Sequence, residues 1–243
     1  MGTSIMVTSG KGGTGKTSLT AAVASCLAAL GHRVLCIDLD IGLRNLDIAL
    51  GLTDRALMDF TDVMERRCSL FTGAVEHPDI RGLFLLTAPV QANGLDTARF
   101  RQVVREACDL FDFVFLDCPA GLGEGFQLAT ASSDRAIVVS ATEPAALRDA
   151  QRAVQELVKT VPEQHLVMNR VDPALMRRLR TTIDEAMDTA GLPLLGVVPE
   201  DDTVTVAASA GIPVVLCGER PAAVAYLNVA NRLLGKKVPL SRR

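Results

Sequence analysis

The chain has 243 residues, of which 28 are acidic and 25 basic, for a net charge of −3 with histidine neutral. This balance does not indicate the broad cationic surface that nucleic-acid-binding domains usually carry. Hydrophobic residues make up 49% of the chain and aromatic residues only 4%, so we expect an aliphatic core of the kind found in parallel sheets covered by helices.

Short β-rich segments alternate with helical patterns along the whole chain. This alternation is typical of βαβ units, so the sequence predicts an α/β fold: a doubly wound, mainly parallel sheet of about eight strands with helices on both faces. We expect one domain over residues 1–243, with a core from about 4 to 235 and a basic tail at 236–243. The predicted strands are 4–9, 33–38, 83–87, 113–117, 136–140, 165–169, 194–198 and 213–216. The predicted helices are 16–30, 97–110, 144–160, 173–190 and 221–234.

A glycine-rich segment, GKGGTGKT at residues 10–17, lies between the first predicted strand and the first predicted helix. It matches G-x-x-x-x-G-K-[ST], in which backbone N–H groups and a helix N-terminus hold phosphates. A glycine turn used only for packing is the alternative, and the strand–loop–helix context disfavours it. The sequence therefore predicts a site for ATP and Mg²⁺, with Lys16 on the β- and γ-phosphates and Thr17 on the metal. The predicted nucleotide contacts here are Gly10, Lys11, Gly12, Gly13, Thr14, Gly15, Lys16, Thr17 and Ser18.

The second residue of this segment, Lys11, is not required by the general pattern. The text KGGTGKT at 11–17 resembles the deviant phosphate loop of the MinD/ParA family of ATPases, whose signature is KGGxGKT. The resemblance implies an ATP-dependent homodimer in which Lys11 reaches the nucleotide of the partner subunit, and it assigns Lys11 and Lys16 to catalysis. A solvated loop lysine is the alternative.

Acidic residues end two of the predicted strands, at the edge where open α/β sheets bind ligands. Asp38 and Asp40 end the second strand, and Asp117 ends the apolar run FVFLD. Helix capping or a turn is the ordinary alternative for such residues. The segment DIGLRNLD at 40–47 resembles switch I of the MinD branch, which implies that Asp40 orients the attacking water and that Arg44 and Asn45 respond to the nucleotide. The predicted metal-site residues are Thr17 and Asp117, from the general chemistry of phosphate loops, and Asp38, for which the resemblance implies a place in the outer shell of the metal.

The segment DCPAG at 117–121 resembles the DxPAG sequence that begins switch II in MinD proteins. A turn at Pro119 and Gly121 offers backbone N–H groups that can sense the γ-phosphate and release it on hydrolysis. Many family members carry a glutamate at the position of Gly123, whereas here the glutamate comes one place later, at Glu124. This departure leaves the role of Glu124 open.

Two later segments, LVMNRVD at 166–172 and GVVPEDDTV at 196–204, resemble the adenine pocket of the family. The resemblance implies that Asn169 hydrogen-bonds the adenine edge and that Arg170 stacks near it. It also implies that the backbone after Pro199, through Glu200 and Asp201, lines the pocket. Strand-to-helix turns with capping residues are the alternative for both segments. A guanine-reading NKxD motif is absent, because Arg170 stands where that motif needs lysine.

Residues 126–152 also resemble MinD, including Asp149, on a helix that takes part in docking the division inhibitor MinC in that family; a solvated face is the alternative. The tail KKVPLSRR differs from the amphipathic helix that ends membrane-bound MinD proteins, and Pro239 disfavours a helix there. We therefore do not expect direct membrane anchoring, although recruitment through a partner remains open. DNA is not an expected partner, because a solvated basic face explains the arginines at 177, 178 and 180 more simply.

The six cysteines form no CxxC pair and no zinc spacing, and several lie in apolar runs. We expect reduced cysteines in a cytoplasmic protein, without a signal peptide or a membrane span. The predicted function is a MinD-like ATPase in division-site placement or related positioning. The alternatives are a ParA-like DNA partition ATPase, a flagellar-positioning ATPase, and a reductase resembling nitrogenase iron protein. The reductase needs cysteines on the dimer face, whereas Cys118 is expected to point inward.

Overall fold

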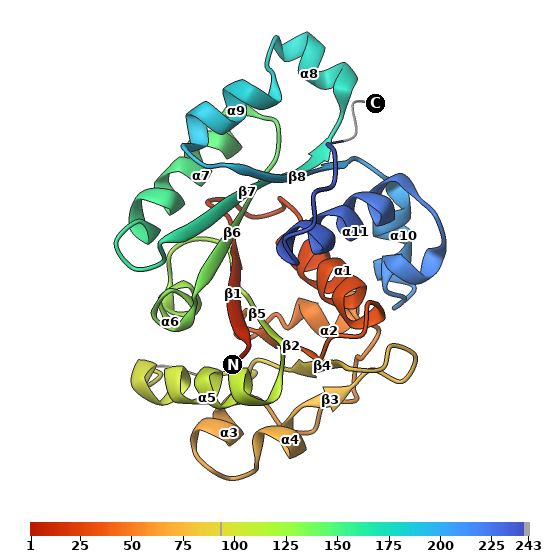
Figure 1. Cartoon of the computed structure of the whole chain (residues 1–243). Coiled ribbons are helices and arrows are strands. Elements are labelled where there is room, and N and C mark those ends of the chain that lie inside the picture. The colour runs from red at the N-terminus through yellow and green to blue at the C-terminus, as the bar shows by residue number, and fades with distance from the viewer. Residues whose placement is uncertain (93, 241–243) are drawn as a thin grey trace.

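The computed structural model describes residues 1–92 and 94–240, and within them eight strands form one sheet (Figure 1). The strand order is β3-β4-β2-β5-β1-β6-β7-β8, with β3 antiparallel to β4 and the other pairs parallel. Every residue of β2, β4 and β5 is buried, as expected for parallel strands covered on both faces. The strands are β1 (Thr3–Thr8), β2 (Val34–Asp38), β3 (Val75–Glu76), β4 (Leu83–Leu86), β5 (Phe113–Asp117), β6 (Arg135–Ser140), β7 (Glu163–Val171) and β8 (Leu194–Pro199).

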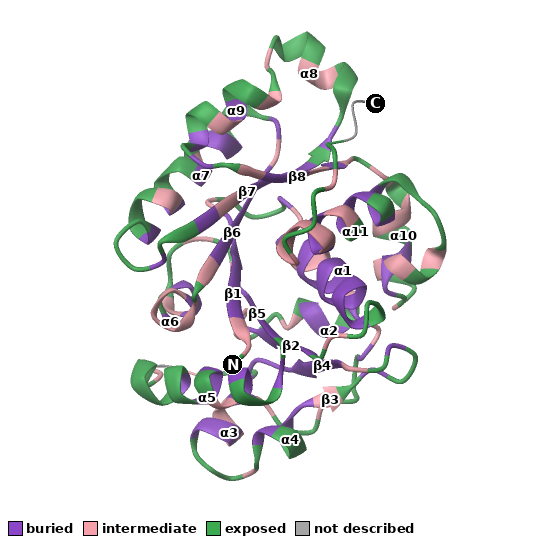
Figure 2. Ribbon diagram, viewed as in Figure 1, coloured by how far each residue is buried: buried purple, intermediate pink, exposed green. Residues whose placement is uncertain are grey.

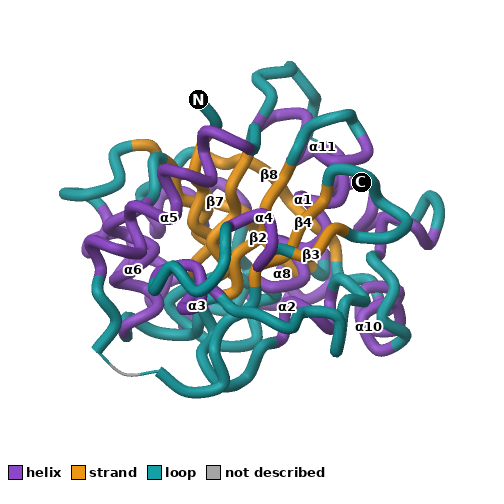
Figure 3. The backbone as a smooth tube through the Cα atoms, turned by 90° about the horizontal axis from the view of Figure 1, so that it is seen from below, coloured by secondary structure: helices purple, strands orange, loops and turns teal. Residues whose placement is uncertain are grey.

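Helices cover both faces of this sheet and build a separate apolar core on each. Seen from below, the strands lie in the middle and the helices around them (Figure 3). One face carries α1 (Lys16–Ala29), α2 (Asn45–Ala49), α10 (Asp202–Ser209) and α11 (Pro221–Leu233). The other carries α3 (Phe60–Met64), α4 (Leu70–Gly73), α5 (Thr97–Leu110), α6 (Glu124–Ser132), α7 (Pro144–Leu157) and α9 (Ile183–Ala190). The remaining helix, α8 (Pro173–Leu179), buries none of its residues (Figure 2).

The predicted strand at 213–216 is wrong, because this segment forms a 3₁₀ helix, η1 (Val214–Cys217). Pro213 precedes it and lacks the N–H that a strand would donate to a neighbour. Val214 is the buried residue of η1 and packs into the core that contains α1, whereas Leu216 is half exposed. The eighth strand is instead β3, whose two residues are too few for a periodic pattern to reveal.

The predicted helix at 173–190 is also wrong as one piece, because the chain leaves the helix at Arg180 and starts again at Ile183. Arg180 adopts a left-handed conformation with φ of +53°. Thr182 then caps α9 by accepting a hydrogen bond from the Glu185 amide, and the Glu185 carboxylate accepts the Thr182 amide. Such a capping box starts a new helix. The short helices α2, α3, α4 and α10, and also α6, were not predicted.

The first helix, α1, is central to one of the two cores. Its residues from 19 to 28 are all buried, against the sheet on one side and α11 on the other. Two polar side chains lie on it, Thr20 and Ser25. Ser25 donates its hydroxyl to the carbonyl oxygen of Ala21 (2.7 Å), within the helix. The single hydroxyl proton of Thr20 lies between two acceptors, the carbonyl oxygen of Lys16 (3.0 Å) and the carboxylate of Asp117 (2.9 Å) on β5, so both hydroxyls have partners. Because α1 starts at the glycine-rich segment, its packing positions that segment.

A test of this packing compares a leucine inside α1 with one directly after it. Leu27 is fully buried, whereas Leu30, directly after the helix, is 41% exposed. We expect Leu27→Ala to lower the free energy of unfolding by about 2–5 kcal/mol, through lost burial and the cavity left behind. Leu30→Ala should change it by less than about 0.5–1 kcal/mol. Urea unfolding measures both, and equal losses in the two variants would contradict a closely packed α1.

Candidate nucleotide-binding site

The glycine-rich segment at 10–17, hereafter the phosphate loop, follows β1, which lies between β5 and β6 in the sheet. Gly13 and Gly15 adopt left-handed conformations with φ of +79° and +85°, which favour glycine. A Cβ on Gly15 would also collide with the side-chain amide of Asn169. No side chain caps the N-terminus of α1, where the first amides have no partner within the helix. This helix end is therefore available to an anion.

The phosphate loop touches two other segments that the sequence singled out. A Cβ on Gly10 would collide with the backbone carbonyl of Asp149 in α7, so the loop and α7 meet backbone to backbone. A Cβ on Gly12 would lie 3.7 Å from Cβ of Ala120 in the DCPAG segment. Of the two loop lysines, Lys16 is buried and Lys11 is exposed. The exposed position leaves Lys11 accessible to a second subunit, and its contact there remains a prediction.

Two of the predicted acids, Asp38 and Asp117, are register partners on adjacent strands and are both 1% exposed. Asp117 accepts hydrogen bonds from the hydroxyls of Thr17 (2.7 Å) and Thr20 (2.9 Å) on α1. Asp38 accepts the backbone amides of Asp40 (2.8 Å) and Leu46 (3.1 Å), which fastens the following segment to the strand end. The structure thus brings together all three predicted metal-site residues.

Burial changes the protonation of both acids. Desolvation, and then the charge of Asp117, raises the pKa of Asp38 to about 7. Desolvation also raises the pKa of Asp117 to about 6, although the hydroxyls of Thr17 and Thr20 and the charge of Lys16 lower it. Oxygen ligands of this kind suit a hard cation such as Mg²⁺, whose charge would stabilise both carboxylates. The buried Thr14 hydroxyl of the phosphate loop has no partner in the described chain and is one further polar group that a ligand can satisfy. These residues fit Mg²⁺ and a phosphate.

Asp40 stands one residue beyond the core and is partly exposed. Its carboxylate contacts the Asn45 side chain at 3.5 Å, near the exposed start of α2. The residue between Asp38 and Asp40, Leu39, donates its amide to the carbonyl of Asp117 at 3.0 Å. The segment that carries Asp40 is therefore held to both strands, while its side chain stays accessible to a ligand.

The residues of the predicted adenine pocket lie next to the phosphate loop, and some have structural partners. The buried Asn169 donates from Nδ2 to the carbonyl of Thr14 at 2.8 Å. The Arg170 guanidinium donates to the carbonyl oxygen of Gly13 (3.2 Å). It also forms a bidentate ion pair with the Glu200 carboxylate (2.9 and 3.2 Å). Asn169 and Arg170 therefore support the loop directly, and their contacts with a base remain predictions.

For Asp201 the structure supplies the capping role that was the alternative reading. Its carboxylate caps α10 through the amide of Thr203 (2.9 Å) and also accepts the amide of Ala222 (3.2 Å) in α11. A backbone contact with a base is still compatible with this role. Pro199 lines a hollow of about 400 Å³ together with Val171 and Pro221.

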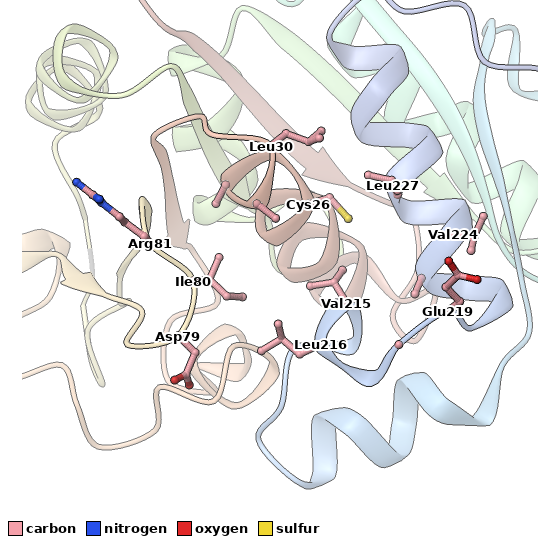
Figure 4. A pocket seen from close by; sticks show the side chains of 14 residues that line it. Cys26, Leu30, Asp79, Ile80, Arg81, Val215, Leu216, Glu219, Val224 and Leu227 are labelled. Carbon is pink, nitrogen blue, oxygen red and sulfur yellow. The ribbon is translucent and has the colours of Figure 1, made fainter.

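A hollow of about 610 Å³ lies elsewhere, between the end of α1, residues 79–81 and the segment that leads into α11 (Figure 4). Apolar side chains such as Leu30, Ile80 and Leu227 dominate its wall. It is about 20 Å from the phosphate loop, because α1 has 14 residues and begins at that loop. This hollow is therefore not part of the nucleotide site.

Two residues near the site were missed or left open by sequence reasoning. Thr20 lies one helical turn beyond Lys16, and this spacing was the available signal for its bond to Asp117. Glu124, whose role the sequence left open, is the first residue of α6 and accepts the backbone amide of Leu95 at 2.6 Å. No local pattern links positions 95 and 124, so the sequence contains no signal for this bond.

Residues 5–214 match the family model described as the CobQ/CobB/MinD/ParA nucleotide binding domain. A septum site-determining protein MinD from Bacillus subtilis is 39% identical, over 99% of this chain and 92% of that protein. The chain belongs to the MinD branch of this family. A MinD protein from Thermotoga maritima is 36% identical, over 99% of this chain and 91% of that protein.

Solved structures agree with this assignment. The chain superimposes with a TM-score of 0.92 on a MinC:MinD cell division protein complex from Aquifex aeolicus, at 34% identity over 99% of this chain and 98% of that one. MinD from Pyrococcus horikoshii, solved with Mg-ADP, gives a TM-score of 0.83 at 28% identity, over 96% of each chain. The predicted family and the doubly wound, P-loop fold are thus confirmed, and family membership makes the chain a nucleotide-binding ATPase.

Two further expectations concern other parts of the chain. Cys118 is 2% exposed inside an apolar core, as expected, and is therefore not placed to bind a cluster at a subunit interface. No helix within residues 1–92 and 94–240 is long and apolar enough to cross a membrane.

The segment that follows α11 is held to that helix through the Arg232 side chain. The guanidinium of Arg232 donates to the carbonyls of Val238 (3.1 Å) and Pro239 (3.0 Å).

The raised pKa of Asp117 predicts a specific pH dependence of stability in nucleotide-free protein. The pKa of Asp117 is about 6 in the folded protein, against the ordinary 3.8, so the folded protein binds this proton more tightly than the unfolded chain does. The proton therefore stabilises the folded protein at low pH, and this contribution is lost as the pH rises from about 4 to about 6. Asparagine cannot ionise, so Asp117→Asn should unfold with a free energy about 1–3 kcal/mol higher than wild type at pH 8 and nearly the same at pH 4. Urea unfolding without magnesium measures this, and parallel pH profiles would contradict it.

Proposed function

We propose that this chain is a MinD-like ATPase that hydrolyses ATP to ADP and phosphate and uses bound ATP to dimerise in division-site placement. The observation that supports it best is the juxtaposition of the uncapped N-terminus of α1 with the buried acids Asp38 and Asp117. One half of this arrangement attracts phosphate, and the other half attracts a divalent cation. ATP with Mg²⁺ supplies both charges.

We assign the binding of ATP to the phosphate loop. Backbone N–H groups of the loop, including those of Gly13 and Gly15, would contact the phosphates, with Lys16 beside them. Thr17, Asp38 and Asp117 would hold Mg²⁺, directly or through water, and the bound metal would neutralise charge that develops on the phosphates. Asn169 and the backbone after Pro199 would contact the adenine.

Asp40 is the proposed residue that orients the attacking water. Its carboxylate is accessible and lies two residues beyond Asp38 in a segment fastened by backbone hydrogen bonds. Water that is oriented in line with the γ-phosphate would break its bond to ADP, and orientation of this kind is a main part of catalysis in phosphoryl transfer. The turn at Pro119 and Gly121 would detect the loss of the γ-phosphate.

Dimerisation follows from the exposed Lys11, which we propose crosses to the nucleotide of a second subunit. We further propose a MinC-like protein as a partner at α7. The complex of MinC and MinD from Aquifex aeolicus, at 34% identity, supports this choice. The contact between the carbonyl of Asp149 in α7 and Gly10 in the phosphate loop gives such a partner a short route to the nucleotide.

Removing Lys16, the buried lysine of the phosphate loop, should greatly weaken nucleotide binding. We expect Lys16→Ala to bind ATP at least about 100-fold more weakly than wild type, because a buried charged contact to the phosphates is lost. Isothermal titration with ATP and magnesium measures this. The exposed Lys159, between α7 and β7, supplies the control Lys159→Ala, which should bind as wild type does. Wild-type affinity in Lys16→Ala would contradict the assignment of the loop.

Asp40→Ala should separate binding from hydrolysis. We expect unchanged ATP affinity and a kcat lowered by about 100-fold, because water orientation is lost while the phosphate contacts remain. The variant should therefore accumulate as an ATP-bound dimer in size-exclusion chromatography with light scattering. Phosphate release at saturating ATP measures kcat. Turnover equal to that of the wild type would refute the role given to Asp40.

A further inference from the structure

We propose that Glu124 is a positioning residue for ATP hydrolysis. Its carboxylate holds the first turn of α6 in place, and this turn positions two neighbours: the backbone next to Asp40 and the phosphate loop. This inference rests on the proposed function. It assigns a role to the glutamate that stands one place away from the family's acidic position. The role is carried by the hydrogen bond that its carboxylate accepts and requires no contact between Glu124 and the nucleotide.

The first turn of α6 is fastened on one side by Glu124 itself. Its Oε1 accepts the backbone amide of Leu95 at 2.6 Å, across 29 positions of sequence. Leu95 is in turn packed against the apolar core that contains α5 and α6. Gly123, the residue before α6, supplies no side-chain cap, so the carboxylate is also the negative group at this helix end.

On its other side, the first turn of α6 packs closely against the segment that carries Asp40. A Cβ on Gly125 would lie 2.6 Å from the carbonyl oxygen of Leu39 and 2.7 Å from Cδ of Pro119. Leu39 lies between the two acids of its strand end and donates its amide to the carbonyl of Asp117 at 3.0 Å. A shift of α6 would therefore change the position of the backbone from which the Asp40 side chain projects.

The turn also borders the phosphate loop through its neighbours. Pro119, which packs against Gly125, is followed by Ala120, and the Ala120 side chain faces Gly12 of the loop. From Leu95 through Glu124, the first turn of α6 is thus connected to Leu39 at one contact and, through Pro119 and Ala120, to the phosphate loop at another. An error of about 1 Å in the geometry of a catalytic site lowers the rate by up to 100-fold, so the loss of one anchor should affect kcat.

Two substitutions at one position test the proposal. Glu124→Ala removes the acceptor, whereas Glu124→Gln keeps an oxygen that can accept the Leu95 amide and removes the charge. We expect Glu124→Ala to lower kcat by about tenfold, with unchanged ATP affinity, and Glu124→Gln to remain within about twofold of wild type. Phosphate release and ATP titration measure these values.

The control is Glu185→Ala, which removes an equivalent glutamate–amide bond at the start of α9 (2.8 Å to the Thr182 amide). Glu185→Ala should lower the free energy of unfolding by about as much as Glu124→Ala does, and it should leave kcat unchanged. If Glu124→Ala turns over like wild type, or if the glutamine variant loses as much activity as the alanine variant, the proposal is wrong. In the second case the charge itself acts.

Amide hydrogen exchange provides a readout that does not depend on turnover. In nucleotide-free protein, Glu124→Ala should exchange faster than wild type at residues 39–41 and 118–125, and Glu185→Ala should not. Unchanged exchange in Glu124→Ala would overturn the positioning role. A wild-type protein that binds no ATP would instead refute the proposed function, and the exchange result would still decide whether Glu124 fastens these segments.

Discussion

Two carboxylates, Asp38 and Asp117, are buried side by side at the carboxyl ends of adjacent strands, and the rest of the site is arranged around them. Desolvation raises the pKa of each, because charge is unfavourable away from water. The threonine hydroxyls of α1 and the amides that follow β2 compensate only part of this cost. A bound cation would compensate the remainder, which is the physical reason for proposing Mg²⁺ beside these two acids.

The same arrangement links the segments that we propose respond to the nucleotide. Asp38 accepts an amide at the start of α2, and Asp117 accepts the Thr17 hydroxyl at the start of α1. The chain from Pro119 to Gly125 contacts both the backbone of Leu39 and the phosphate loop. Backbone contacts through glycines, at Gly10 and Gly125, make these approaches as close as chain geometry allows. Because the contacts involve backbone rather than flexible side chains, a change at the phosphates can reach α6 and α7 over short distances.

Much of the fold could be predicted, because the buried strands are continuous apolar runs and long helices such as α5 and α7 have clear periodicity. α1 has little periodicity, because its residues 19–28 are all buried, and the phosphate-loop pattern before it marked its start. The strand at 213–216 failed because an apolar run beside Pro213 does not reveal whether a neighbouring strand is available. Within the site, the phosphate loop was recognisable from its residue spacing together with its place between a predicted strand and a predicted helix. The bond of Glu124 to Leu95 was not, because it joins segments whose proximity exists only in the folded chain. For the bond of Thr20 to Asp117, helical spacing from Lys16 was a signal that was not used.

A crystal structure with a non-hydrolysable ATP analogue and magnesium would decide whether these elements form one site. We expect the phosphates to lie against the amides of residues 12–18, the metal to lie beside Thr17 and the two strand-end acids, and a second copy of the chain to place Lys11 on the same nucleotide. A nucleotide bound elsewhere, or a phosphate loop that stays closed by its own side chains at saturating ligand, would contradict this arrangement.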